Sequence, residues 1–284
     1  MARIQPYAST SMPSFMFDIF FYPFMQRALI AGVILAAVLA LLGVYVLLKR
    51  MSFFSDGIAH ASLAGIALGI VFSWQPLTTA LVLSAFFALI IYVIERKLEL
   101  ASDTAIGILF TSGMALGILL ISLQPGYQPE LISFLFGNIL AIGQTELWLI
   151  GLFSVIIVGF VIVYFKQLTL IALDEELAYI SNVKVNVLQP IFYVFLALAV
   201  VLGIKMLGVI LVSALLILPT AAARILAPSF KKFIVLAVLL AEIIVLCGLT
   251  LSVMFDLPTG PVIVLVGTFC FIMSLLGKLL LYKK

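Results

Sequence analysis

The sequence predicts an all-α polytopic membrane protein, and three observations lead to that fold class. The 284-residue chain is 65% hydrophobic and only 10% charged, whereas charged residues make up roughly 25% of an ordinary soluble chain. Apolar runs near the ~20 residues that a helix needs to cross a bilayer recur from end to end. Basic residues concentrate in alternate connections between these runs. We therefore expect a single transmembrane domain spanning residues 1–284, with the lipid bilayer as its surroundings.

Each apolar run is a candidate membrane-spanning helix. The runs at 189–204 and 206–222 are short, so one of them could be a partial span and the expected count is eight or nine. The candidate spans are 28–48, 57–73, 76–94, 104–123, 146–165, 189–204, 206–222, 233–254 and 259–277.

The segment before the first span, residues 15–27, is aromatic and mixed in polarity. This pattern favours a helix lying at the membrane interface and leading into the first span. Residues 1–14 lack the charged start, short apolar core and small-residue cleavage site of a signal peptide. The apolar part of the loop near 131–143 is too short to cross and return as two helices. We expect a re-entrant or half-helix segment there, buried in protein or lining a cavity.

The distribution of lysine and arginine predicts the orientation. Twelve of the 15 basic residues fall on one set of connections, which the positive-inside rule makes cytoplasmic. The C-terminus is then inside, and with nine spans the N-terminus is outside. The net charge of +3 forms no basic patch, so the sequence indicates no nucleic-acid partner. The cytoplasmic segment 166–188 carries acids at 174–176, which favour the start of a short helix.

Asp56 and His60 are the most informative pair in the chain. His60 is the only histidine, and the spacing i, i+4 places both side chains on one face of a helix. A carboxylate and an imidazole sharing a face inside a membrane are costly unless they have a function. Together they supply half of a transition-metal site. The alternatives are a helix cap for Asp56 and a hydrogen-bonded packing role for His60.

Other polar residues have simpler explanations. Glu242 lies near mid-membrane and is either functional or paired with a neighbouring helix. Asp103 opens a span, where N-capping accounts for it. Cys247 and Cys270 read as small core residues, with neither a disulfide nor a metal site expected. No GxxxxGK[ST] nucleotide loop occurs, and one histidine already on a span makes no hydrolase site. We therefore expect no enzyme and no cofactor.

Several motifs, in order along nearly the whole chain, resemble the zinc/manganese uptake permeases of bacterial ABC transporters. The most specific are the acid-to-histidine block at 49–62 and the block at 208–221. Related blocks lie at 23–28, 103–109, 135–141 and 257–261. Asn138 departs from the pattern, because relatives often carry Asp there, and this puts a ligand role at 138 in doubt.

The resemblance implies the permease subunit of an ATP-driven importer in the bacterial inner membrane. It implies a homodimer, a cytoplasmic ATP-binding subunit, and an extracytoplasmic metal-binding protein that docks outside. Asp56 and His60 correspond to the acid and histidine that meet the ion. The helix at 170–182 corresponds to the coupling helix, with its central residues Asp174, Glu175, Glu176, Leu177, Ala178 and Tyr179. Ala61 and Ser62 look more like zinc members, which favours Zn²⁺ as the transported substrate over Mn²⁺ or Fe²⁺.

Two rival functions come from other classes. A secondary, ion-coupled metal carrier would use Glu242 and Asp56 as proton sites and need no ATPase. A receptor-like membrane subunit would have no transport pathway. Neighbouring genes for an ATPase and a metal-binding protein would favour the importer.

Overall fold

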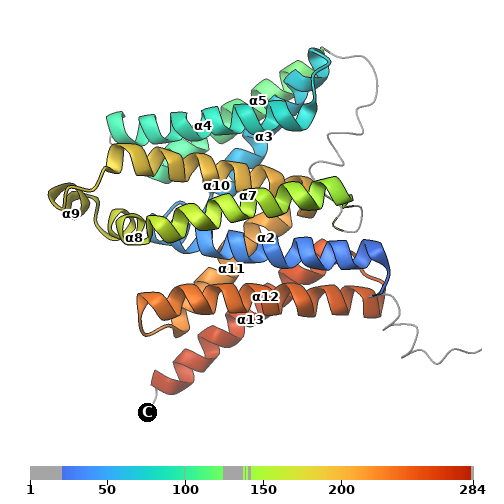
Figure 1. The fold of residues 1–284 in the computed structure, drawn as a ribbon, viewed down its shortest axis with the longest axis vertical. Helices are drawn as coiled ribbons and strands as arrows, with labels where there is room; N and C mark the ends of the chain where they lie inside the picture. Colours follow the sequence, from blue (N-terminus) through green and yellow to red (C-terminus); the bar gives the residue numbers. More distant parts are fainter. Residues whose placement is uncertain (1–20, 99, 124–136, 138, 140–141, 283–284) are drawn as a thin grey trace, which may run out of the picture.

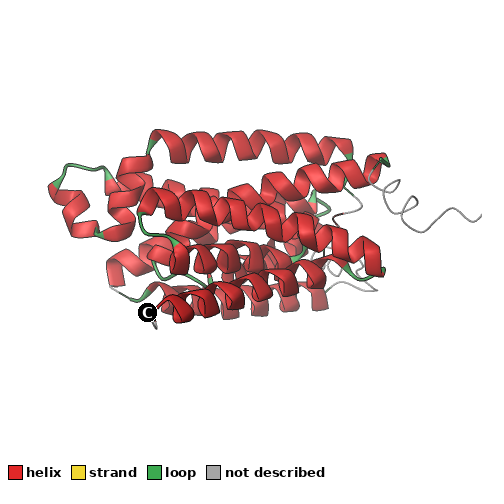
Figure 2. Ribbon diagram, turned by 90° about the horizontal axis from the view of Figure 1, so that it is seen from below, coloured by secondary structure: helices red, strands yellow, loops and turns green. Residues whose placement is uncertain are grey.

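The computed structural model describes residues 21–98, 100–123, 137, 139 and 142–282, and within them every regular element is a helix. The long helices run side by side as a bundle (Figures 1 and 2). The helices are α2 (Pro23–Leu48), α3 (Phe54–Val71), α4 (Pro76–Leu98), α5 (Ser102–Ser122), α7 (Gln144–Val163), α8 (Phe165–Leu173), α9 (Glu175–Ile180), α10 (Val185–Leu207), α11 (Val209–Leu226), α12 (Phe230–Phe255) and α13 (Thr259–Tyr282). The all-α fold class is confirmed.

Nine helices in the described part of the chain are long and apolar enough to cross a membrane. The two runs that looked short in the sequence are both full candidates, because α10 extends to 23 residues and α11 to 18. Gly208 alone separates them. Its φ of 84° lies in the region that glycine adopts without a steric cost. The eight-span alternative is therefore wrong for these two helices. Pro219 lies inside α11, which continues past it to Leu226.

The bundle is organised around α2. This helix packs against α7, α11 and α12, while α3 packs against α4 and α5. Two-thirds of the apolar window of α2, α3 and α10 is buried, whereas α4, α7 and α13 expose most of theirs. In a membrane protein, such exposed apolar faces are suited to lipid or to another subunit. The buried helices α2, α3 and α10 thus form the core of the bundle, and α4, α7 and α13 lie at its periphery.

Two predictions on segments near the outer end have mixed outcomes. Of the predicted interfacial helix, residues 23–27 form the first turns of α2, and residues 15–20 lie outside the described residues; the position of this segment at the membrane interface stays a prediction. Pro23 at the first helical position explains the early start, since its fixed φ suits a helix N-terminus. Most of 131–143 also lies outside the described residues, including Asn138. Its described residues Ile139 and Ile142 are buried.

The connections rich in lysine and arginine meet at one end of the bundle. The α2–α3 turn, the α4–α5 turn and α8–α9 lie at the end from which the C-terminus also leaves (Figure 1). This arrangement agrees with the assignment of that end to the cytoplasm. We refer to it below as the inner end.

Candidate functional site

The candidate site is a cavity of about 470 Å³ at the inner end, between α3 and α5. Asp56 lies in the first turn of α3, and His60 follows one turn later on the same face. Both side chains line the cavity and both are half-buried. The cavity is lined by Phe53, Asp56, His60, Asp103, Ile106, Gly107 and Phe110. The predicted pair therefore opens onto a common space.

Asp56 does not cap its helix. The N-cap residue of α3 is Phe53, and no side chain makes a capping hydrogen bond there. Instead, the Ser213 hydroxyl of α11 donates to Asp56 Oδ1 at 2.7 Å, and Ser55 Oγ donates to Ser213 Oγ at 3.1 Å. A hydroxyl donor that fixes a carboxylate is the usual support for a metal ligand. Ser213 was not predicted as part of the site, because it stands 157 residues away from Asp56.

His60 has a free ring nitrogen. Its Nδ1 is buried and has no hydrogen-bond partner among the described residues, so the alternative of a hydrogen-bonded packing histidine is not supported at this atom. The ring is positioned by Phe110, whose centroid lies 4.5 Å away at an interplanar angle of 73°. An edge-to-face contact of this kind orients the imidazole. The His60 ring thus lines the cavity, and its buried Nδ1 makes no hydrogen bond among the described residues.

Asp103 is the cavity residue that sequence reasoning missed. It was predicted to cap α5, but the N-cap is Ala101 and no side-chain capping bond forms there. Asp103 is exposed and lines the cavity from the α5 side. Even so, the described residues contain no group of three His, Cys, Asp or Glu close enough to hold a metal ion. The cavity thus brings together two candidate ligands, with a third carboxylate on the opposite wall.

Close packing of α3 against α5 fixes the walls of the cavity. A Cβ added at Gly57 would lie 2.6 Å from Ile106 Cγ2, and one at Gly113 would lie 2.8 Å from the Ala61 Cα. These glycines let the two backbones approach closely, as small residues do in membrane helices. Gly107 is different: it faces the cavity, and an added Cβ there would meet no atom within 4 Å.

The predicted cytoplasmic helix is present as α9. Asp174 is its N-cap, and Asp174 Oδ1 accepts a hydrogen bond from the Leu177 N–H at 2.9 Å. Ala178 is fully buried against α8 and α10. Leu177, Tyr179 and Ile180 are exposed. An exposed apolar edge on a short helix at the inner end is a surface on which another protein could dock.

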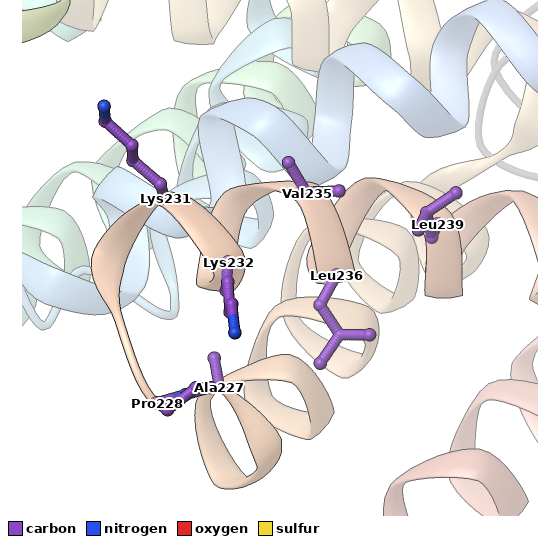
Figure 3. Close-up of a pocket in the computed structure, with 7 residues that line it drawn as sticks. All are labelled: Ala227, Pro228, Lys231, Lys232, Val235, Leu236 and Leu239. Atoms are coloured by element: carbon purple, nitrogen blue, oxygen red, sulfur yellow. The ribbon is translucent and has the colours of Figure 1, made fainter.

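The remaining polar candidates do not join the cavity. Glu242 lies on α12, which packs against α2, α11 and α13, and its buried Oε2 accepts no hydrogen bond from the described residues. Cys247 and Cys270 are free thiols, as expected. A second cavity of about 370 Å³ lies near the start of α12, where Lys231 and Lys232 stand beside an apolar wall (Figure 3). Two like charges exclude a cation site there.

Comparison with known proteins decides the family. Residues 21–278 match the ABC 3 transport family. The chain belongs to this family. Its relatives include the high-affinity zinc uptake system membrane protein ZnuB of Haemophilus influenzae, 31% identical over 93% of this chain and 99% of that protein. They also include the manganese transport system membrane protein MntC of Listeria monocytogenes, 33% identical over 90% and 91%.

Solved structures agree with this family. The fold is similar to that of PsaBC from Streptococcus pneumoniae, solved in complex with Fab, at a TM-score of 0.80 and 33% identity, covering 93% of this chain and 95% of that one. The predicted resemblance to metal-uptake ABC permeases is confirmed. The chain is a multi-pass permease of the bacterial inner membrane and a transport subunit rather than an enzyme. Family membership also removes the support for a secondary carrier.

Proposed function

We propose that this chain is the permease subunit of an ATP-driven importer whose transported ion is Zn²⁺, and that Asp56 and His60 meet the ion inside the membrane. The observation that carries the proposal is the shared cavity, which a hydroxyl-supported carboxylate and an imidazole line from one helix face. Both groups lower the cost of taking a divalent cation out of water.

Zn²⁺ is chosen over Mn²⁺ or Fe²⁺ on the sequence motif, because the Ala61–Ser62 continuation resembles zinc members of the family. Imidazole together with carboxylate suits zinc, but manganese also accepts one nitrogen among oxygen ligands. Relatives named for zinc and for manganese have nearly equal identity to the chain, so the motif is what supports the choice.

The proposed partners are those that the family implies. Two protein ligands are too few for a zinc shell, which usually has four positions. The remaining ligands would come from Asp103 on α5, from a second copy of this chain or from water. A cytoplasmic ATP-binding subunit would supply the energy, and an extracytoplasmic metal-binding protein would deliver the ion.

The site is tested by uptake into proteoliposomes that hold the permease with its ATP-binding subunit and metal-binding protein. Asp56→Ala and His60→Ala should each reduce uptake of Zn²⁺ to the level of empty liposomes while the complex still assembles. Thr250→Ala is a matched control, because this exposed hydroxyl bonds only to its own helix, at Leu246 O. Wild-type uptake by both alanine variants would refute the site. Better uptake of Mn²⁺ or Fe²⁺ than of Zn²⁺ would refute only the choice of ion.

We further propose that α9, with its residues Glu175, Glu176, Leu177, Ala178 and Tyr179 and its cap Asp174, couples the permease to the ATP-binding subunit. Ala178→Pro tests this role. The Ala178 N–H donates to Asp174 O at 3.1 Å, and proline removes that donor and breaks the short helix. ATP hydrolysis should then continue without uptake. Normal uptake by Ala178→Pro would contradict the assignment.

A further inference from the structure

A continuous set of polar and aromatic contacts connects α9 with the walls of the cavity. It begins at Glu175, the first residue of α9. Arg96 Nη1, on α4, donates to Glu175 Oε1 at 3.0 Å, and Lys49 Nζ lies 3.9 Å from Glu175 Oε2. Lys49 is the C-cap residue of α2, immediately before the turn into α3. One carboxylate of α9 therefore contacts two of the helices that build the transmembrane bundle.

Lys49 is an unusual cation for this position because its side chain is only 9% exposed. Burial lowers the pKa of its amine, and the nearby carboxylates of Glu95 and Glu175 act in the opposite direction. The amine also lies 5.6 Å from the centroid of the Tyr193 ring, a cation–π distance. A buried charge that loses its partner is strongly disfavoured. Separating Lys49 from Glu175 would leave a buried charge without this partner, so we expect Lys49 to move with Glu175 when α9 moves.

Tyr193, fully buried on α10, links Lys49 with the α3 wall. The centroids of the Tyr193 and Phe54 rings lie 5.8 Å apart in an edge-to-face arrangement. Phe54 is fully buried and is the first residue of α3, two positions before Asp56. A displacement of Tyr193 therefore acts on the first turn of the helix that carries the candidate metal ligands.

Tyr193 also links to the α5 wall. Its hydroxyl donates to Glu95 Oε2 at 2.6 Å, and Ser102 Oγ donates to Glu95 Oε1 at 2.7 Å. Ser102 is the first residue of α5 and precedes Asp103 directly. The same tyrosine thus contacts the start of α3 directly and the start of α5 through Glu95.

We propose that Glu175, Lys49, Tyr193 and Glu95 form a transmission cluster, through which movement of α9 changes the spacing of Asp56 and His60 relative to Asp103. This inference rests on the proposed coupling role of α9. The four residues are positioning residues, since none of them lines the cavity. Interdigitated polar contacts of this kind favour discrete arrangements over continuous deformation, which is what a two-state transporter requires.

The test is the number of ions transported per ATP hydrolysed in the reconstituted complex. Glu175→Gln removes the charge that holds Lys49 and Arg96, and Tyr193→Phe removes only the hydroxyl that bonds Glu95. Each should lower the ratio by a factor of about 2 to 30, the range of coupling changes seen for mutations that touch neither ligand. ATP hydrolysis itself should be retained. Lys97→Gln is the matched control, because this exposed residue next to Arg96 makes none of the ion pairs found among the described residues.

Retained ATP hydrolysis by an intact complex separates a loss of transmission from a simple loss of structure. Wild-type ratios in both Glu175→Gln and Tyr193→Phe would overturn the inference. Detachment of the ATP-binding subunit from Glu175→Gln would also overturn it, by making Glu175 a docking contact. If Ala178→Pro uncouples while these variants do not, α9 keeps its coupling role and only the cluster is refuted. Normal uptake by Ala178→Pro refutes the coupling role itself.

Discussion

The crossing of α2 and α11 at Gly43 gives a prediction whose size can be worked from the structure. A Cβ added at Gly43 would lie 2.1 Å from the Leu216 carbonyl oxygen and 2.9 Å from Thr220 Cγ2. Ordinary van der Waals contact begins at 3.4 Å, so Gly43→Ala must push the backbone of α11 away by about 1.3 Å if α11 alone moves. Because the obstacle is a backbone atom inside a helix, rotamer changes cannot relieve the clash.

Overpacking of a tight core typically costs about 1–3 kcal/mol, and this overlap belongs at the upper end of that range. Replacing glycine by alanine within a helix returns up to about 1 kcal/mol. The net loss for Gly43→Ala is therefore about 2 kcal/mol, which changes the ratio of folded to unfolded protein by a factor of about 30. With an unfolding entropy of about 2.1 cal/mol/K per residue, the melting temperature of this 284-residue chain should fall by about 3 °C.

The assay is thermal melting of the purified permease in detergent, followed by the recovery of monodisperse protein on size exclusion. Gly159→Ala is the matched control, since a Cβ on this α7 glycine would meet no atom within 4 Å. It should melt at or slightly above the wild-type temperature. If Gly43→Ala melts together with wild type and Gly159→Ala, the two helices do not approach as closely as described, and the reasoning fails.

Two further predictions test the cavity and the topology. Gly107→Leu places a side chain into the open space of about 470 Å³ and should block uptake while leaving the melting temperature unchanged, so unimpaired uptake would show that the ion does not pass this wall. The topology test introduces single cysteines on a background of Cys247→Ser and Cys270→Ser. An impermeant thiol reagent added outside should not label cysteines at Lys97, Ser181 and Lys231, whereas it should label one at Gln75. The reverse pattern would invert the orientation.

The spans were predictable because a bilayer imposes a length on any helix that crosses it. The sequence underestimated α10, whose apolar run looked short between Gln189 and Lys205. The structure shows how the helix extends past both residues. Gln189 is buried and its amide donates to the Tyr193 hydroxyl at 3.5 Å, while Lys205 pairs with Glu146 at 2.7 Å. The partner of Gln189 lies one turn along the same helix, whereas Lys205 is paired with a residue of α7, and a partner on another helix has no local signal in the sequence.

The candidate site also combines features that are local in the sequence with contacts between distant helices. The spacing of Asp56 and His60 is local, so placing them on one face was possible from sequence. Ser213 comes from another helix, and only the packing of α11 against α3 brings it to Asp56. Asp103 was missed for a different reason. N-capping already accounts for an acid in the first turn of a helix, so no feature of the sequence pointed to a place for Asp103 on the cavity.

The incomplete ligand set is consistent with transport for a physical reason. A zinc site with four protein ligands in fixed positions binds tightly and can stabilise a fold outright, so it would hold the ion rather than pass it on. Here the two proposed ligands share the helix α3, and a third carboxylate stands on α5, so the number of protein groups near an ion would depend on the separation of two helices. Each of these helices begins next to the transmission cluster, at Phe54 and at Ser102. A small movement at the inner end could therefore change how strongly the cavity holds a cation without moving any ligand along its own helix. We expect affinity for the ion to follow the state of α9, and a permease with Glu175→Gln to lose that dependence while keeping Asp56 and His60 intact.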